Sequence, residues 1–228
     1  MKLLGLETSG RVGSVALVLD GRIEAREIPT PREQTERLLP LVDELLRGAG
    51  LAVGDLDGIA FGRGPGSFTG LRIAAAVAQG LAAPRGLPLL PVSSLLCLAQ
   101  RAWRSEAITR ALVCVDAHMG EVYHAAYRKV AAGWEELSAP GLHKPDAIPV
   151  PREGGWTGYG DGFAAHRDGL STRLGDRLLA VRPETTPTAR AVLKLAIPRF
   201  AAGEAKDAAT ALPVYLRDKV ALKTVERR

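Results

Sequence analysis

Two acidic residues, Glu7 and Asp116, occupy similar places in the chain, each at the end of a short apolar run. Each is followed by a turn-forming segment, residues 8–13 and residues 117–120. Paired carboxylates that face one cleft can act as a base or anchor a metal ion, and the turns can offer backbone N–H groups to a phosphate. The alternative is structural, because acidic residues favour the start of turns in any protein.

A glycine-rich loop, Gly64-Pro-Gly-Ser-Phe-Thr-Gly70, lies between a strand predicted to end near Phe61 and a helix predicted to begin near Thr69. Glycines allow the backbone to approach a ligand closely, and a helix N-terminus presents unpaired N–H groups to an anion. No Gly-Lys-Ser/Thr follows, so this is not a Walker A loop. The candidate phosphate-binding residues are Glu7, Thr8, Ser9, Gly64, Gly66, Ser67 and Asp116.

Other catalytic patterns are missing from the sequence. The four histidines show no metal-ligand spacing, so we expect no metal site, and we expect His118 and His124 to be ordinary surface residues. There is no G-x-S-x-G elbow and no assembled Ser/His/Asp signature. We therefore expect no catalytic residues and doubt that the chain is an enzyme by itself.

The predicted elements occur in two similar series. The first has strands at 3–7, 14–19 and 22–28, a helix at 34–47, a strand at 58–61, a helix at 69–83, a strand at 87–92 and a helix at 93–104. The strand–acid–turn–strand order restarts at Ala111, and a last helix is expected over 188–202. This order predicts a duplicated α/β fold with mixed sheets, the architecture of actin, sugar kinases and chaperone ATPases. The expected halves are residues 1–105 and 106–228, with the alternative that the last helix packs back on the first half.

Two helices carry more apolar surface than one sheet face requires. The helix at 69–83 is apolar on nearly every side, so it must be buried on nearly every side. Either the two helices cover each other, or they form a partner interface. The predicted interface residues are Leu38, Leu41, Val42, Leu45, Arg72, Ile73, Ala75, Ala76 and Gln79.

The composition gives weaker indications. A net charge of +5 suits contact with a polyanion such as tRNA, but no basic cluster in the sequence is interleaved with aromatic residues. Glu7 comes too early for a signal peptide, and no apolar run approaches the roughly 20 residues that span a bilayer. We expect a cytoplasmic protein that does not contact membranes.

The string GRGPGSFTGLRIAAAVAQGLA, which begins at Gly62, resembles the signature of the TsaB (YeaZ) family of bacterial tRNA-modification proteins. The resemblance covers nearly the whole chain. Other similar segments are Leu6–Ser9 with Ser14–Leu17, Glu36–Leu45, Val115–Tyr123 and Pro213–Ala221. Three residues depart from the pattern: Glu7 stands where Asp is usual, Gln34 where His is common and His118 in place of Arg.

The resemblance implies a non-catalytic subunit that binds the catalytic relative TsaD. With the ATPase TsaE it would support transfer of threonylcarbamoyl to the adenosine beside the tRNA anticodon. It also implies a homodimer when the chain is alone, contact with tRNA through the complex, and no tightly bound cofactor, with ATP or ADP in the assembled complex. TsaD holds a metal through an H-x-x-x-H pair, and the matching residues here are Ser94 and Leu98. Because leucine has no donor atom, that site cannot form.

Two other functions stay open at this point. One is a small nucleotide-dependent phosphotransferase or ATPase that uses Glu7, Asp116 and the glycine loops. The other is a peptidase that acts on its partner.

Overall fold

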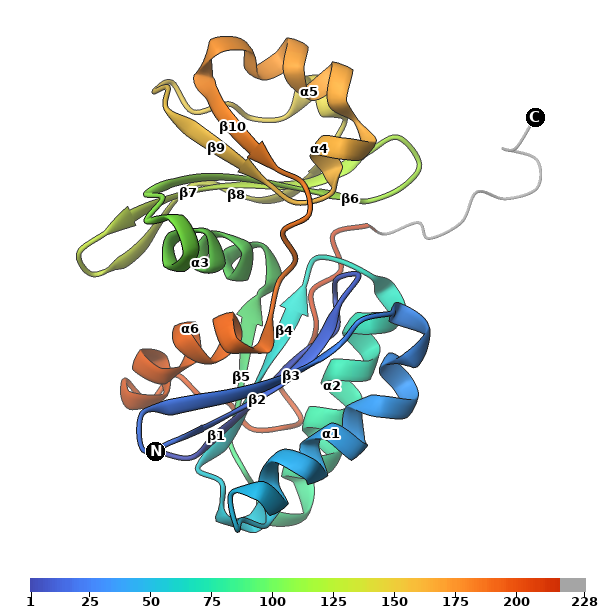
Figure 1. Cartoon of the computed structure of the whole chain (residues 1–228), viewed down its shortest axis with the longest axis vertical. Helices are drawn as coiled ribbons and strands as arrows, with labels where there is room; N and C mark the ends of the chain where they lie inside the picture. Colours follow the sequence, from blue (N-terminus) through green and yellow to red (C-terminus); the bar gives the residue numbers. More distant parts are fainter. Residues whose placement is uncertain (218–228) are drawn as a thin grey trace.

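The computed structural model describes residues 1–217, which form two halves, each built on a five-stranded mixed sheet (Figure 1). In the first sheet β1 pairs antiparallel with β2 and parallel with β4. Its strands, in sheet order, are β3 (Arg22–Ile28), β2 (Gly13–Leu19), β1 (Leu3–Glu7), β4 (Gly58–Gly64) and β5 (Leu89–Ser93). The β2–β3 hairpin turns at Asp20-Gly21, where both residues have positive φ, as the Asp-Gly signal predicts.

The second sheet repeats this topology. β6 pairs antiparallel with β7 and parallel with β9, as β1 does with β2 and β4. Its strands, in sheet order, are β8 (Gly133–His143), β7 (Val122–Val130), β6 (Arg110–Asp116), β9 (Trp156–Tyr159) and β10 (Leu178–Arg182). The two equal strand orders confirm the duplicated α/β fold.

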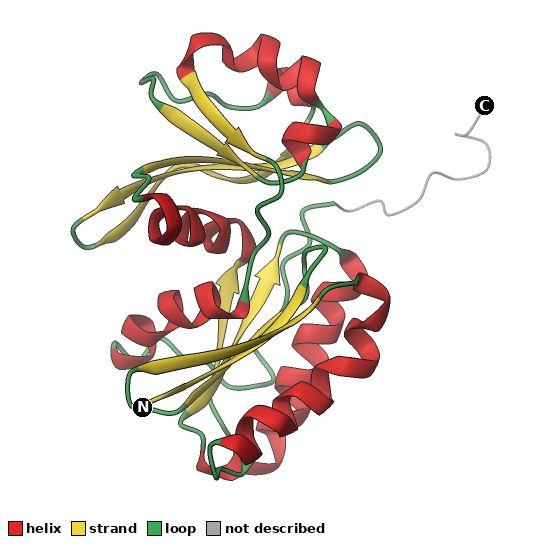
Figure 2. Cartoon of the chain, in the orientation of Figure 1, coloured by secondary structure: helices red, strands yellow, loops and turns green. Residues whose placement is uncertain are grey.

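Helices cover both faces of each sheet (Figure 2). The helices are α1 (Gln34–Gly48), α2 (Phe68–Ala82), α3 (Ser94–Glu106), α4 (Gly162–Ala165), α5 (Arg167–Leu174) and α6 (Ala189–Ala201). Short 3-10 turns occupy Pro31–Glu33, Val53–Asp55, Ala83–Arg85, Pro145–Ala147 and Gly175–Arg177. On β1, Leu4 and Leu6 pack with α1 and α2, while Leu3 packs with α6 on the opposite face, as strand alternation requires.

The two halves exchange their last helices. α3 follows the first sheet in the chain, yet Leu95 and Leu98 pack with Ala111 and Val113 of the second sheet. α6 follows the second sheet, and its Leu193 packs in the core cluster that holds Leu3 of the first. A sequence division after residue 105 therefore places α3 with the first half, although its packing places it with the second.

The segment after α6 returns along the first half. Lys206 and Leu89 exchange backbone hydrogen bonds of 2.7 and 2.8 Å, and Val214 N donates to Arg63 O at 2.8 Å. Part of the C-terminal segment that resembles the family, residues 218–221, lies outside the described residues. Within the described part of the chain, no helix is long and apolar enough to cross a membrane.

Candidate functional site

The carboxylate of Glu7 lies inside the first half rather than in a cleft. The residue is 0% exposed. One carboxylate oxygen accepts a hydrogen bond from Ser9 N at 2.6 Å, and the other accepts one from Ser94 Oγ at 3.0 Å. Burial raises the pKa of Glu7 despite the opposing effect of these hydrogen bonds. Both oxygens are therefore engaged by the protein itself.

The turn after β1 packs directly against the glycine-rich loop. Thr8 Oγ1 donates to Gly70 O at 2.6 Å, and Ser67 N donates to Ser9 O at 2.8 Å. Ser67 caps α2, since its Oγ accepts from Gly70 N at 3.3 Å. The glycines permit this approach, because a Cβ on Gly70 would overlap Thr8 O. The turn and the loop bind each other where a phosphate would otherwise bind.

Gly64 and Gly66 have structural reasons to be glycine. Gly64 has φ of +97°, and its N–H donates to Ser94 Oγ at 3.2 Å. A Cβ on Gly66 would lie 2.7 Å from Ser9 O. The structure thus brings together six of the seven predicted phosphate-site residues, and it joins them to one another.

Asp116, the seventh, ends β6 in the second half. Its Oδ1 accepts hydrogen bonds from His118 N at 2.9 Å and from His166 Nε2 at 3.0 Å, and its Oδ2 lies 3.1 Å from His118 Nδ1. Burial raises the pKa of Asp116, but the hydrogen bonds from His166 and His118 outweigh burial, so the pKa is lowered. Asp116 is held as a carboxylate.

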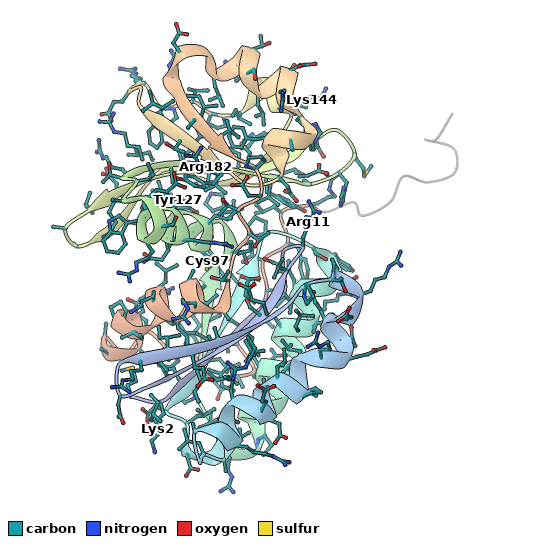
Figure 3. The ribbon with its side chains drawn as sticks, viewed as in Figure 1. Lys2, Arg11, Cys97, Tyr127, Lys144 and Arg182 are labelled. Atoms are coloured by element: carbon teal, nitrogen blue, oxygen red, sulfur yellow. The ribbon has the colours of Figure 1, made fainter. Side chains whose placement is uncertain are left out.

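A cleft of about 530 Å³ separates the two turns. Ser9, Arg11 and Ser67 line it from the first half, and Asp116 and His118 line it from the second. Figure 3 shows Arg11 at the level of the gap between the halves. The cleft is therefore the place where the duplicated fold brings both strand ends together, with Asp116 exposed to it and Glu7 withdrawn beneath one wall.

The C-terminal segment closes one end of this cleft. Arg217 Nη2 donates to Ala117 O at 3.0 Å and to His118 O at 3.1 Å, and it forms an ion pair with Glu121 at 2.8 Å. The ring of Tyr215 lies 5.4 Å from the ring of Phe68 on α2. The sequence analysis missed Arg217 and the role of His166, because only the fold places them beside residues 116–118.

One histidine prediction is wrong. His118 is a surface residue, with its side chain 86% exposed. His124 is 0% exposed on β7, and burial lowers its pKa to about 4. Strand alternation points it into the core, where the imidazole stays neutral. Among residues 1–217, no group of three His, Cys, Asp or Glu side chains could hold a metal ion.

The predicted partner surface needs correction in part. Leu38, Leu41, Val42 and Leu45 are at most 7% exposed and pack in the core against the first sheet, so the structure places them away from any free surface. Ala75 also faces this core. The apolar arc of α1 is wide because the helix contacts both the sheet and α2.

Other predicted interface residues lie on the outer side of α2. Arg72 and Ala76 are exposed and Ile73 is half-buried. The guanidinium of Arg72 lies 3.9 Å from the ring centroid of Phe68. Gln79 instead binds the chain itself, since its Nε2 donates to Ala208 O and Ala211 O at 3.1 and 3.2 Å. The free face of α2 is therefore narrower than predicted.

Comparison with known proteins agrees with the fold and the sequence motifs. The family model for TsaD, tRNA N6-adenosine threonylcarbamoyltransferase, matches residues 29–167. The tRNA threonylcarbamoyladenosine biosynthesis protein TsaB of Escherichia coli (strain K12) is 40% identical, over 98% of this chain and 97% of its own. The TsaB of Haemophilus influenzae is 33% identical, over 100% of this chain and 98% of its own.

A solved structure shares this architecture. YeaZ from Pseudomonas aeruginosa is 40% identical, with a TM-score of 0.86 over 94% of this chain and 99% of its own. The duplicated sheets and the cleft between the two strand ends define an actin-like protein of two halves. Within that class, the chain belongs to the TsaB (YeaZ) family.

The lowered pKa of Asp116 leads to a prediction on acid stability. Since the folded-state pKa lies below the ordinary 3.8, the carboxylate stabilises the fold above that pH, and the contribution is lost as the pH falls through the folded-state value. We expect Asp116→Asn to lower the free energy of unfolding by about 1–2 kcal/mol at pH 7. The difference should shrink toward pH 3. Urea unfolding at both pH values measures it, and a difference that grows on acidification would contradict the prediction.

Proposed function

We propose that this chain is a non-catalytic subunit in the formation of threonylcarbamoyladenosine in tRNA. Full-length similarity to proteins named for that pathway supports the role. The observation that carries the non-catalytic part is the closed state of the first strand end. Glu7 is fully buried and hydrogen-bonded to Ser9 and Ser94, and the turn after it is bonded to the glycine loop. A phosphotransferase would need these groups free to meet its ligand.

The proposed partners are a TsaD-type catalytic subunit and a TsaE-type ATPase, with tRNA bound by the complex. We infer that the chain forms a homodimer when it is alone, and that ATP or ADP binds only once the complex has assembled. Because tRNA modification of this kind takes place where tRNA is made and used, we place the protein in the cytoplasm. The family model for TsaD, which matches residues 29–167, supports a common fold for the two subunits.

Reconstitution tests the proposal. tRNA is incubated with threonine, bicarbonate, ATP and the pathway's other three proteins, with or without this chain, and the modified nucleoside is quantified by mass spectrometry. We expect product only when the chain is present. Equal product without it would overturn the proposed role. ATP turnover by the isolated chain that disappears in Asp116→Asn would favour the phosphotransferase alternative instead.

The free face of α2 is the proposed contact with the catalytic subunit. Ala76 is exposed on this face, whereas Ala75 is 5% exposed and belongs to the core. Ala76→Glu places an uncompensated charge in the contact without disturbing the fold. We expect the Kd of the heterodimer to rise at least about 100-fold, since burial of an unpaired charge costs several kcal/mol.

Calorimetric titration of the two subunits measures this effect. Ala164→Glu on α4 is the matched control, because Ala164 is also an exposed helical alanine but lies in the second half. It should bind like the wild type. An unchanged Kd for Ala76→Glu would exclude this face from the contact.

A further inference from the structure

A basic pocket lies on the side of the molecule where α3 and α6 face each other across the two halves (Figure 1). Its volume is about 180 Å³. Four cationic side chains line it, Arg101 and Arg104 from α3 and Arg190 and Lys194 from α6. The spacings of three and four residues place each pair on one side of its helix, so both helices direct positive charge at the same space.

These cations have few acidic neighbours. Among residues 1–217, none of the four takes part in an ion pair, whereas Glu106 pairs with Arg182 at 3.1 Å and Glu24 with Arg26 at 2.7 Å. Arg101 Nη1 donates to Thr186 O at 2.9 Å, which fixes one guanidinium at the rim. Four positive charges gathered in a concave site repel one another unless an anion joins them.

A buried amide points to a ligand independently of the charges. Gln100 is 6% exposed, yet it lines the pocket. Its Oε1 accepts a hydrogen bond from Trp134 Nε1 at 2.9 Å. Within residues 1–217, no acceptor for its Nε2 is hydrogen-bonded to it, so this N–H₂ group is available to the pocket. The N-terminus of α6, capped by Thr188, lies at the same place and adds its positive dipole end.

Aromatic side chains extend this surface along α3. The ring of Trp103 has Lys129 Nζ at 4.8 Å and Arg104 Cζ at 6.0 Å from its centroid. Lys129 Nζ also lies 5.7 Å from the centroid of Trp134. Cations interleaved with indole rings are typical of surfaces that bind the phosphates and bases of RNA. Three segments far apart in the sequence, α3, β7 and β8, supply these residues.

We propose that the surface made by Arg101, Arg104, Arg190 and Lys194 binds the phosphodiester backbone of tRNA. The inference rests on the proposed function for its choice of RNA, and it gives this subunit a direct contact with the substrate. The pocket itself takes one phosphate group. The aromatic rings beside it lie against the neighbouring nucleotides.

Charge reversal on α6 tests the contact. Arg190 and Lys194 are exposed, so Arg190→Glu with Lys194→Glu leaves the core unchanged. Binding of fluorescent tRNA to the full chain is measured by anisotropy at several salt concentrations. We expect the affinity to fall at least about tenfold, and the slope of log K against log[salt] to fall by roughly 1.5 to 2, at about 0.7–0.9 per phosphate contact.

Controls separate a site from a general charge effect. Arg152→Glu with Arg177→Glu makes the same change in net charge on exposed residues of the second half. An equal loss in that variant, or no loss in the α6 variant, would overturn the proposal. Arg104→Glu, on the other helix, should reproduce the loss if α6 alone is perturbed by its two substitutions. Thermal unfolding monitored by circular dichroism checks that each variant is folded.

Two further measurements identify the ligand and the cause of a failure. If the α6 variant loses binding of inorganic phosphate but keeps tRNA affinity, the pocket is a small-anion site and the RNA proposal is wrong. If the variant binds tRNA poorly but wild-type chain is dispensable in reconstitution, the proposed pathway role fails while the contact stands. A variant that supports modification with an unchanged KM for tRNA would contradict the contact and leave the pathway role intact.

Discussion

Gly70→Ala is expected to destabilise the chain by at least about 3 kcal/mol, the upper end of the cost of overpacking a core. Gly70 is buried in the first turn of α2, and an added Cβ would overlap the carbonyl oxygen of Thr8. Backbone atoms cannot move aside as a flexible side chain can. The substitution must therefore separate the turn after β1 from the start of α2, and with it break the hydrogen bond from Thr8 Oγ1 to Gly70 O.

Gly80 in the same helix provides the control. It is exposed, and no atom lies within 4 Å of an added Cβ. Gly80→Ala should stabilise the isolated chain by about 0.5–1 kcal/mol, since alanine has the higher helix propensity. Chemical denaturation at low protein concentration measures both variants. Similar destabilisation by the two would mean that helix context, and not the contact with Thr8, governs Gly70.

Gly62→Ala is expected to destabilise the chain by about 2–3 kcal/mol through a different contact. An added Cβ at Gly62 would overlap the carboxylate of Glu7, which has no route to solvent because the residue is fully buried. The clash is with a side chain, so a shorter acid should relieve it. Glu7→Asp alone should also destabilise, because it withdraws the carboxylate from Ser9 and Ser94.

The double variant Glu7→Asp with Gly62→Ala distinguishes these causes. We expect it to be more stable than the sum of the two single effects by at least about 1 kcal/mol, a favourable coupling measured by a double-mutant cycle. Additive effects would show that Gly62 is required by its backbone alone. A favourable coupling would explain why a glutamate can stand where the family pattern has an aspartate.

The local elements could be predicted from the sequence because their signals lie within a few residues. Asp20-Gly21 predicted the hairpin, and Ser67 and Thr188 predicted helix starts that the structure confirms as caps. The strand–acid–turn–strand series at Glu7 and Asp116 predicted the duplication. The short elements α4, α5 and β10 were missed, because runs of four to eight residues carry too little periodicity to be recognised.

The family and the duplicated fold were determined by the sequence itself, since motifs and the order of elements are properties of the chain. The tertiary structure decided the state of the predicted site. Two acids that look equivalent in sequence differ in the fold: Glu7 is sealed beneath the glycine loop, while Asp116 is exposed to the cleft and bound by His118 and His166. Their burial depends on Gly62 and on side chains from other elements.

Only the tertiary structure decided which helix faces are free. The leucines of α1 are taken up by the sheet and by α2, because helix contacts depend on the direction of packing as well as on the width of the apolar arc. It also decided where the positive charge gathers. No basic cluster interleaved with aromatics exists in the sequence, but the exchange of α3 and α6 between the halves brings Arg101, Arg104, Arg190 and Lys194 to one pocket beside Trp103.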